Sequence, residues 1–323
     1  MTRIDARVRR TCLVAVIGLG CLLGLSDPAS AQSPYSDIVT FGTSMSDAGN
    51  AFVLLGDHAT PPDFSLSPLL VPSAPYARGG HHLTNGPTWI EQFAKSVGLG
   101  QSAMPALRSS NPGANNFAVG AARAYDDGVN YNLTLQVDAY LQRSGGVASA
   151  QTLYAIEMGI NDIRDALEVY GAGGDGAPIV AQAVAAIAAN IQRLYAAGAR
   201  EFLVWLSPNA ALSPAVRAVG PAAGAIALQV TLAFNGALAQ TLAALPLALP
   251  GSSFTTLDAF TLLNTVVAAP AAYGLTNVAT PCLTPNVPPF TCNRPDEYLF
   301  WDGIHPTTAG HAIVARQALT IVQ

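Results

Sequence analysis

The chain has 323 residues, of which 50% are hydrophobic and 11% are charged. It is long and apolar enough to bury a sizeable core, which excludes an intrinsically disordered chain. The formal net charge of -5 leaves no excess of basic residues for gripping a phosphate backbone, so a nucleic-acid partner is excluded as well.

The first 31 residues read as an export signal. Four arginines within the first ten residues precede an apolar run over residues 12–25, and Ala29-Ser30-Ala31 has the small-residue pattern of a signal-peptidase site. The run is 14 residues long, short of the roughly 20 that span a bilayer. We therefore predict a signal peptide over residues 1–31, a mature start at Gln32, no stable membrane span and a secreted or periplasmic protein. A membrane anchor, or lipid attachment at Cys21, is the alternative.

The mature chain, residues 32–323, is expected to form one domain of alternating strands and helices. It carries 11 basic and 18 acidic residues, a net charge of -7. Apolar, β-branched and aromatic runs predict strands over residues 38–41, 116–119, 153–158 and 202–206. Apolar or alanine-rich stretches predict helices over residues 179–197, 221–245 and 308–321. Because a strand, a helix and a strand at this spacing pair in parallel, we expect an α/β fold with a mostly parallel sheet.

Two segments far apart in the chain could supply serine chemistry. Ser44 stands just past the first predicted strand, where open parallel sheets bind ligands, and Asp302 stands three residues before His305. A serine hydroxyl is a weak nucleophile until an imidazole takes its proton, and a carboxylate holds that imidazole in the right tautomer. The three residues are therefore candidates for nucleophile, orienting acid and base, although each alone also fits an ordinary turn or surface loop.

Further donors for an oxyanion hole follow the predicted strands. Asn161 comes after Gly159 at the end of the third strand, Gly120 and Ala121 follow the second, and the backbone N–H of Ser44 follows the first. Acyl transfer needs such donors where negative charge develops on the carbonyl oxygen. Ordinary roles stay open, because Asn161 is also a good helix N-cap and Gly120 fits a tight turn.

Cys282 and Cys292 lie in a proline-rich stretch that leads toward the Asp302 segment. In an exported protein, two such thiols most simply form a disulfide, which would hold the catalytic loop in place. Buried free thiols are the alternative. His81-His82 has no acidic or cysteine partner at ligand spacing, so we expect an exposed loop pair and no metal site.

Four blocks stand in order along the mature chain: residues 42–50 (GTSMSDAGN), 116–122 (NFAVGAA), 159–162 (GIND) and 302–306 (DGIHP). Together they resemble the blocks of the GDSL, or SGNH, esterase and lipase family, and residues 85–89 (NGPTW) resemble a segment of its larger secreted branch. The resemblance covers nearly all of the mature chain. It implies a three-layer α/β/α sandwich of flavodoxin-like type around a sheet of about five strands.

The resemblance also implies roles for the candidate residues. Ser44 would be the nucleophile, His305 the general base and acid, and Asp302 its orienting carboxylate, with the donors named above forming the oxyanion hole and no metal or cofactor. Two positions depart from the family pattern: Thr43 stands where aspartate is usual, and Ala121 where a second glycine is usual. Threonine keeps a hydroxyl for local hydrogen bonds, and alanine keeps its N–H but resists a positive φ.

The implied activity is that of a secreted serine esterase or lipase acting on small-molecule or lipid carboxylic esters through an acyl-enzyme. A polysaccharide O-acetyl esterase of the same fold is the alternative, and a non-catalytic carbohydrate- or lipid-binding module is a second. Apolar residues in the long loop over residues 57–84, such as Phe64, Leu69 and Leu70, favour acyl chains. The sequence does not indicate an oligomeric state.

Overall fold

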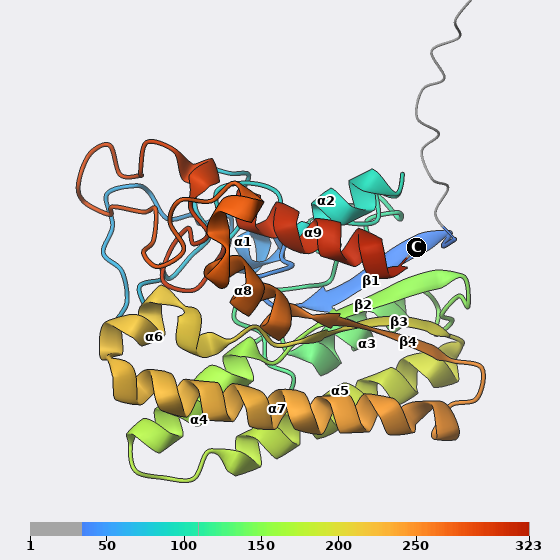
Figure 1. The fold of residues 1–323 in the computed structure, drawn as a ribbon. Helices are drawn as coiled ribbons and strands as arrows, with labels where there is room; N and C mark the ends of the chain where they lie inside the picture. The colour runs from blue at the N-terminus through green and yellow to red at the C-terminus, as the bar shows by residue number, and fades with distance from the viewer. Residues whose placement is uncertain (1–33, 109, 323) are drawn as a thin grey trace, which may run out of the picture.

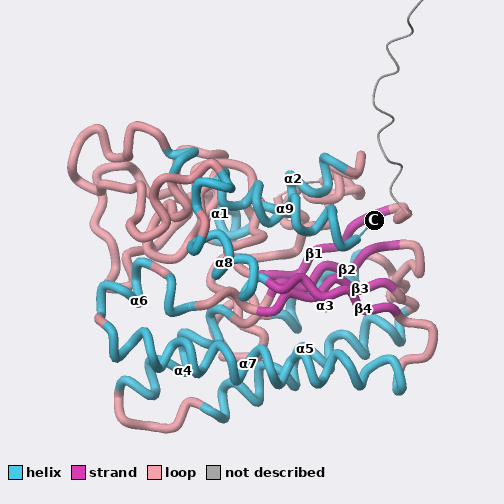
Figure 2. The backbone as a smooth tube through the Cα atoms, in the orientation of Figure 1, coloured by secondary structure: helices cyan, strands magenta, loops and turns pink. Residues whose placement is uncertain are grey.

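The computed structural model describes residues 34–108 and 110–322 (Figure 1). The predicted signal peptide over residues 1–31 and the predicted mature start at Gln32 lie outside the described residues. Four strands form one sheet (Figure 2), namely β1 (Asp37–Gly42), β2 (Thr152–Glu157), β3 (Glu201–Leu206) and β4 (Ser253–Asp258).

All four strands run parallel, in the spatial order β1-β2-β3-β4. Three of the predicted strands are confirmed as β1, β2 and β3. The strand β4 of the structure is not among the predicted strands. Its sequence SFTTLD has few apolar residues, and only Leu257 is buried at this edge of the sheet. The register pairs Gly42 with Glu157, which places the carboxyl ends of β1 and β2 side by side.

The strand predicted over residues 116–119 is not a regular strand, although it lies along the free edge of β1. Phe117 N–H donates to Thr40 O at 2.8 Å and Val119 N–H donates to Gly42 O at 3.1 Å. The Asn116 side chain accepts from Ala118 N–H at 3.0 Å, and such a local side-chain bond competes with a regular ladder. The expected sheet of about five strands is thus four strands with an irregular fifth segment.

Helices cover both faces of the sheet and make a three-layer α/β/α sandwich (Figure 1). One face is covered by α3 (Leu133–Arg143), α4 (Ile160–Gly171), α5 (Ala177–Ala197) and α7 (Pro221–Ala248). The other is covered by α2 (Trp89–Ser96), α9 (Thr308–Val322) and the start of α8 (Ala259–Ala268). Shorter elements in the loops are α1 (Asn50–Leu54), α6 (Pro214–Val219) and the 3₁₀ turns Ala210–Leu212, Pro270–Tyr273 and Pro295–Glu297. The three predicted helices are confirmed as α5, α7 and α9.

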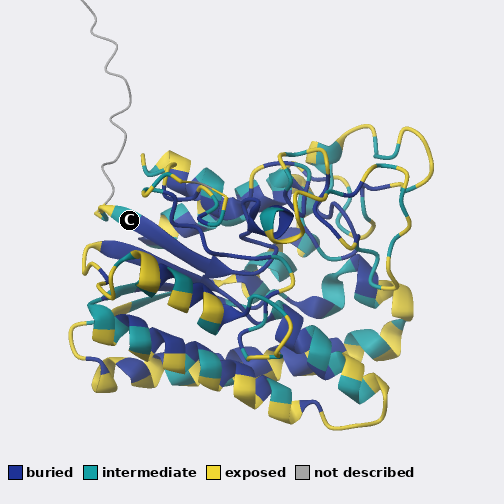
Figure 3. Ribbon diagram, turned by 180° about the vertical axis from the view of Figure 1, so that it is seen from behind, coloured by how far each residue is buried: buried dark blue, intermediate teal, exposed yellow. Residues whose placement is uncertain are grey.

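Side chains along each strand alternate between the two helical layers. Ile38 and Leu203 pack toward α2 and α9, whereas Phe41 and Val204 pack toward α3, α5 and α7. Since both faces of the sheet are covered, the central strands read as continuous apolar runs. Figure 3 shows the result: the strands and the inward faces of the helices are buried, and the outward faces of the helices are exposed.

Two helices, α5 and α7, are long and apolar enough to cross a membrane by length and composition. Each buries one side in the core: Ile187 and Ile191 of α5, and Phe234 and Leu238 of α7, are at most 1% exposed. The helices of a large hydrophobic core meet the same test of length and apolarity, and packing against the sheet accounts for the apolar residues on the buried side of each helix.

Candidate active site

The nucleophile candidate lies in a tight turn that follows β1. Ser46 N–H donates to Thr43 O at 3.1 Å, which closes the turn around Ser44. Ser44 is 6% exposed. In the described part of the chain its hydroxyl forms no hydrogen bond and its backbone N–H has no acceptor. Both groups are therefore free to meet a substrate.

A buried carboxylate contacts this turn, at a residue that the sequence analysis did not single out. Glu157 ends β2, and its oxygens accept from Thr43 N–H at 2.9 Å, from Thr43 Oγ1 at 3.0 Å and from Ser46 Oγ at 3.1 Å. A Cβ at Gly42 would lie 3.0 Å from Glu157 Oε2, so a side chain at this position would crowd the approach. Burial raises the pKa of Glu157 to about 7, against the hydrogen bonds that it accepts.

The structure brings Asp302 and His305 together within one turn. His305 Nδ1 lies 2.6 Å from Asp302 Oδ2, and the N–H groups of Ile304 and His305 donate to Asp302 Oδ1 at 2.8 and 2.7 Å. Asp302 is 0% exposed and His305 is 5% exposed. Because a carboxylate accepts at Nδ1, this nitrogen carries the hydrogen and Nε2 is left as the basic site.

Tyr76 supports the same carboxylate, and the sequence analysis missed it. Its hydroxyl donates to Asp302 Oδ2 at 2.6 Å across 226 residues of sequence. The ring of Tyr76 packs edge-on against Trp301, with 5.8 Å between ring centroids. Burial, together with the charge of Asp302, raises the pKa of Tyr76 well above its usual value, so the phenol remains a donor. Nothing in the local sequence of the long loop marks this contact.

The predicted oxyanion donors are not equivalent. Gly120 N–H already donates to Asp47 Oδ2 at 2.8 Å. Within the described residues Ala121 N–H has no acceptor. Asn161 Nδ2 donates one hydrogen to Ala122 O at 2.8 Å, and among residues 34–108 and 110–322 its second amide hydrogen has no acceptor. Ala121 has a φ of 65°, in the left-handed region, so the departure from glycine falls where alanine is strained.

Asparagines of the first two blocks tie the nucleophile turn to residues 116–122. Asn50 Nδ2 donates to Asn116 O and to Ala118 O, both at 2.8 Å, and Asn116 Nδ2 donates to Ser46 O at 2.7 Å. Asn50 and Asn116 are fully buried. These side chains fix the turn that carries Ser44 relative to the turn that carries the Ala121 N–H.

A cavity of about 310 Å³ adjoins these groups. Met45, which follows Ser44, lines the cavity together with Asn161 and with Ile304 from the His305 turn. The rest of the wall is mostly apolar and comes from α4, α6, α8 and α9, with residues such as Leu167, Val216, Leu262, Val266 and Ile313. The predicted oxyanion donor Asn161 and direct neighbours of the predicted nucleophile and base thus line one mostly apolar cavity, whereas Ser44 and His305 themselves do not line it.

This arrangement has a counterpart in known proteins. Residues 38–318 match the family GDSL-like Lipase/Acylhydrolase. The chain belongs to this family. It is therefore a carboxylic ester hydrolase, of the esterase and lipase type.

Individual relatives of this GDSL protein are distant. The thermolabile hemolysin of Vibrio parahaemolyticus is 27% identical over 316 residues, which cover 91% of this chain and 65% of the hemolysin. A GDSL esterase/lipase of Arabidopsis thaliana is 26% identical over 328 residues and 92% of each chain. The crystal structure of an acetylxylan esterase from Geobacillus stearothermophilus aligns with a TM-score of 0.40 and 15% identity, over 90% of this chain and 95% of the esterase. Similarity at that level carries no conclusion about substrate.

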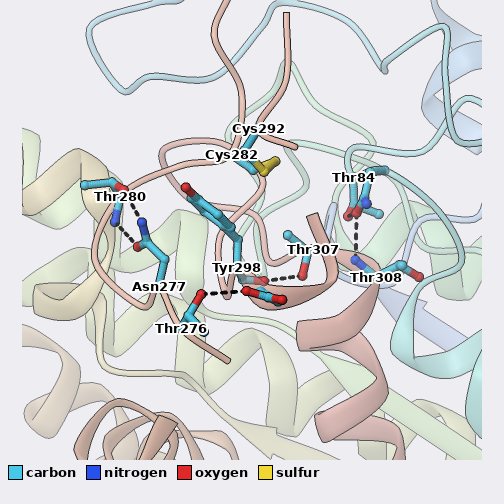
Figure 4. The surroundings of a disulfide bond; sticks show 11 residues. Thr84, Thr276, Asn277, Thr280, Cys282, Cys292, Tyr298, Thr307 and Thr308 are labelled. Carbon is cyan, nitrogen blue, oxygen red and sulfur yellow. Dashed lines mark hydrogen bonds between the residues drawn. A yellow bond between two sulfur atoms is a disulfide. The ribbon is translucent and has the colours of Figure 1, made fainter. Parts of the chain in front are cut away.

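The GDSL protein contains the predicted disulfide between Cys282 and Cys292, with 4.9 Å between their Cα atoms (Figure 4). Cys282 N–H donates to Phe300 O at 3.0 Å, and Cys292 N–H donates to Cys282 O at 2.7 Å. The disulfide loop is therefore bonded to the segment that runs directly into Asp302. It braces the loop that carries Asp302 and His305.

The expectation of an exposed histidine pair is wrong for His82. This residue is 7% exposed, and its Nε2 lies 2.9 Å from Glu91 Oε2. Burial lowers the pKa of His82, but the hydrogen bond and charge of Glu91 outweigh it and raise the pKa overall. His81 stacks on Phe52, with 3.7 Å between ring centroids. Over residues 34–108 and 110–322, no group of three or more His, Cys, Asp or Glu side chains is placed to hold a metal ion.

Proposed function

We propose that this GDSL protein is an exported serine esterase that hydrolyses carboxylic esters through an acyl-enzyme intermediate, with Ser44, His305 and Asp302 as its triad. The observation that carries the proposal is the 2.6 Å contact between His305 Nδ1 and Asp302 Oδ2. It holds the imidazole with Nδ1 protonated and Nε2 available, which is the state that a general base requires. The hydroxyl of Ser44 has no competing partner in the described structure.

In the proposed reaction, Ser44 Oγ attacks the ester carbonyl while its proton moves to His305 Nε2. Collapse of the tetrahedral intermediate breaks the bond to the alcohol oxygen, which takes the proton from His305. Water then attacks the acyl-enzyme with the same base, and the acid product leaves with Ser44 restored. Asp302 stays ionised and stabilises the imidazolium that forms in each half-reaction.

Three groups are proposed to bind the oxyanion: Ser44 N–H, Ala121 N–H and the free amide hydrogen of Asn161. Gly120 is proposed to shape the turn instead, because its own N–H is bonded to Asp47 and a Cβ at this glycine would lie 2.4 Å from Leu83 Cδ1. Removing one donor from such a site costs about 100-fold or more in rate.

The cavity favours esters of longer acyl chains over acetyl esters. Its wall of leucine, isoleucine and valine side chains begins at Asn161 and at Ile304 beside the base. An acetyl group would leave most of that 310 Å³ in contact with water, whereas each methylene of a longer chain gains about 0.8 kcal/mol by entering an apolar site. A polysaccharide O-acetyl esterase is the weaker candidate for this reason.

The test uses purified mature protein with the p-nitrophenyl esters of acetate, butyrate, octanoate and palmitate. We expect kcat/KM to rise from acetate to octanoate, and Ser44→Ala and His305→Ala to lower it at least about 1,000-fold. A fluorophosphonate should label Ser44 and should not label Ser44→Ala.

Absence of both turnover and labelling would contradict the esterase proposal and would favour a non-catalytic carbohydrate- or lipid-binding module. Activity restricted to acetate, with release of acetate from acetylated xylan, would favour the O-acetyl esterase.

A further inference from the structure

Glu157 contacts the nucleophile turn on both sides of Ser44, but no step of the proposed reaction uses it. Its Oε2 accepts from Thr43 N–H at 2.9 Å, one residue before the nucleophile, and from Ser46 Oγ at 3.1 Å, two residues after it. Trp89 Nε1 donates to Ser46 Oγ at 2.8 Å, which directs the Ser46 hydrogen toward Glu157. The side chain is 3% exposed.

The sequence of the turn explains why such a contact is needed. In the GDSL pattern that this chain resembles, aspartate precedes the serine, whereas Thr43 precedes Ser44 here, so residues 43–46 contain no carboxylate. Thr43 Oγ1 instead reaches both oxygens of Glu157, at 3.0 Å each. The β1–β2 register puts Gly42 opposite Glu157, so a side chain at the end of β2 can reach the residues that follow Gly42.

We propose that Glu157 is a positioning residue for Ser44, which supplies from the neighbouring strand the carboxyl group that the family usually carries directly before the nucleophile. By bonding Thr43 and Ser46, it fixes the backbone on which the Ser44 hydroxyl and N–H are mounted. This rests on the proposed role of Ser44 as nucleophile. Misplacement of a reacting group by about 1 Å can cost about 100-fold in rate, so we expect loss of the Glu157 contacts to lower kcat.

The surroundings of Glu157 fit this role better than that of an ion-pair partner. Among the described residues no lysine, arginine or histidine lies within ion-pair distance of its carboxyl group. Its partners are one backbone N–H and two hydroxyl groups, all from the nucleophile turn. Either protonation state can hold that turn, because a neutral carboxyl can donate through Oε1 to Thr43 Oγ1 while Oε2 continues to accept.

An exchange of the two side chains tests the proposal. The variants are Glu157→Thr, Thr43→Asp, the double exchange Thr43→Asp/Glu157→Thr, and Glu157→Gln, with Glu201→Gln at the opposite end of the sheet as control. For each we would measure kcat and KM on p-nitrophenyl octanoate, the rate of fluorophosphonate labelling at Ser44, and thermal unfolding by circular dichroism.

We expect Glu157→Thr to lower kcat and the labelling rate by about 10- to 100-fold, with KM within about threefold of the parent. Thr43→Asp places two buried carboxyl groups in contact and should also lower both. The double exchange restores one carboxyl and one hydroxyl, so its kcat and labelling rate should be at least about tenfold higher than those of Glu157→Thr. Glu157→Gln keeps one acceptor oxygen, so its kcat and labelling rate should fall less than those of Glu157→Thr.

Two outcomes would overturn the proposal. One is a Glu157→Thr variant that labels as fast as the parent. The other is an exchange whose losses are the product of the single losses, which would show that positions 43 and 157 do not act together. Failure of the proposed function is distinct from both, because the parent protein itself would then neither label at Ser44 nor turn over ester.

Discussion

Tyr76 and Asp302 are joined by a hydrogen bond of 2.6 Å, made to the same oxygen that meets His305 Nδ1. Asp302 therefore accepts from four donors: two backbone N–H groups on Oδ1, and the phenol and imidazole on Oδ2. The long loop that carries Tyr76 thus contributes to the orientation of the proposed base as well as to the walls of the site.

The Tyr76 contact predicts a kinetic effect of Tyr76→Phe. This change removes one hydrogen bond to a charged group and leaves the ring packed against Trp301. Because such a bond is worth about 1.5 kcal/mol or more, we expect kcat/KM to fall about tenfold while the cavity, and therefore the preferred chain length, is unchanged. Steady-state kinetics on the ester series checks this. Tyr273→Phe, in the 3₁₀ turn Pro270–Tyr273, is the matched control, and equal activity of the two variants would contradict the role of Tyr76.

Ala121→Gly is predicted to stabilise the protein. The φ of 65° at this residue costs an alanine about 1 to 2 kcal/mol, and glycine removes that strain at the expense of about 0.4 to 1 kcal/mol of added freedom in the unfolded chain. The midpoint of thermal unfolding should rise by about 1 to 4 °C. Ala122→Gly, one residue later, should lower it instead. A lower midpoint for Ala121→Gly would show that the turn does not strain alanine.

The buried carboxyl of Glu157 predicts a pH-dependent stability. Burial raises the pKa of Glu157 from 4.5 to about 7, so between these values the folded state holds a proton that the unfolded state has released. The stability contributed by that proton is present below pH 4.5 and is lost as pH rises through 7. Asp162, whose pKa burial raises to about 6, acts in the same direction.

Other buried groups also make stability depend on pH: burial lowers the pKa of His311 to about 3, so this histidine makes stability rise with pH. A comparison of Glu157→Gln with the parent isolates the contribution of Glu157, because His311 is present in both proteins. The difference in unfolding midpoint, variant minus parent, should increase between pH 5 and pH 8 by about 5 °C. Differential scanning calorimetry at four pH values checks it, with Glu201→Gln as control. A difference that is constant with pH would mean that Glu157 does not titrate in this range.

Reduction of the disulfide should destabilise the loop before Asp302. A ring closed by Cys282 and Cys292 contributes about 2 to 3 kcal/mol by loop entropy, and residues 32–323 contain no other cysteine. Dithiothreitol should therefore lower both the unfolding midpoint and kcat. The double variant Cys282→Ala/Cys292→Ala should behave like the reduced protein and should be insensitive to the reductant. Unchanged kcat in the double variant would show that the disulfide does not help to position His305.

The sequence was sufficient for the fold class and for much of the sheet, because the central strands are buried on both faces and read as apolar runs. It failed at β4, whose edge position leaves Ser253, Thr256 and Asp258 exposed. It also overestimated the regularity of residues 116–119, where the Asn116 side chain bonds locally. In both places tertiary position, rather than local pattern, decides the structure.

The candidate site divides in the same way. Short-range motifs contain the Asp302–His305 turn and the loop of Ser44, so those residues could be named from spacing and resemblance. Tyr76 and Glu157 could not, because each acts across more than 100 residues of sequence. The occupation of Gly120 N–H by Asp47 is likewise a tertiary contact.

The last prediction concerns chain length. Ala223, near the start of α7, lines the cavity and is half-buried, whereas its neighbour Ala222 is exposed and does not line it. Ala223→Trp should fill part of the cavity without disturbing Ser44 or His305. We expect kcat/KM for octanoate and palmitate esters to fall at least about tenfold, since a blocked chain loses about 0.8 kcal/mol for each methylene left in water. Acetate hydrolysis should stay within about twofold, because an acetyl group does not reach α7.

Ala222→Trp is the control for the effect of placing a tryptophan on this helix. If Ala223→Trp slows acetate and palmitate equally, the cavity does not hold the acyl chain, and the chain must lie along the loops over residues 57–84 instead.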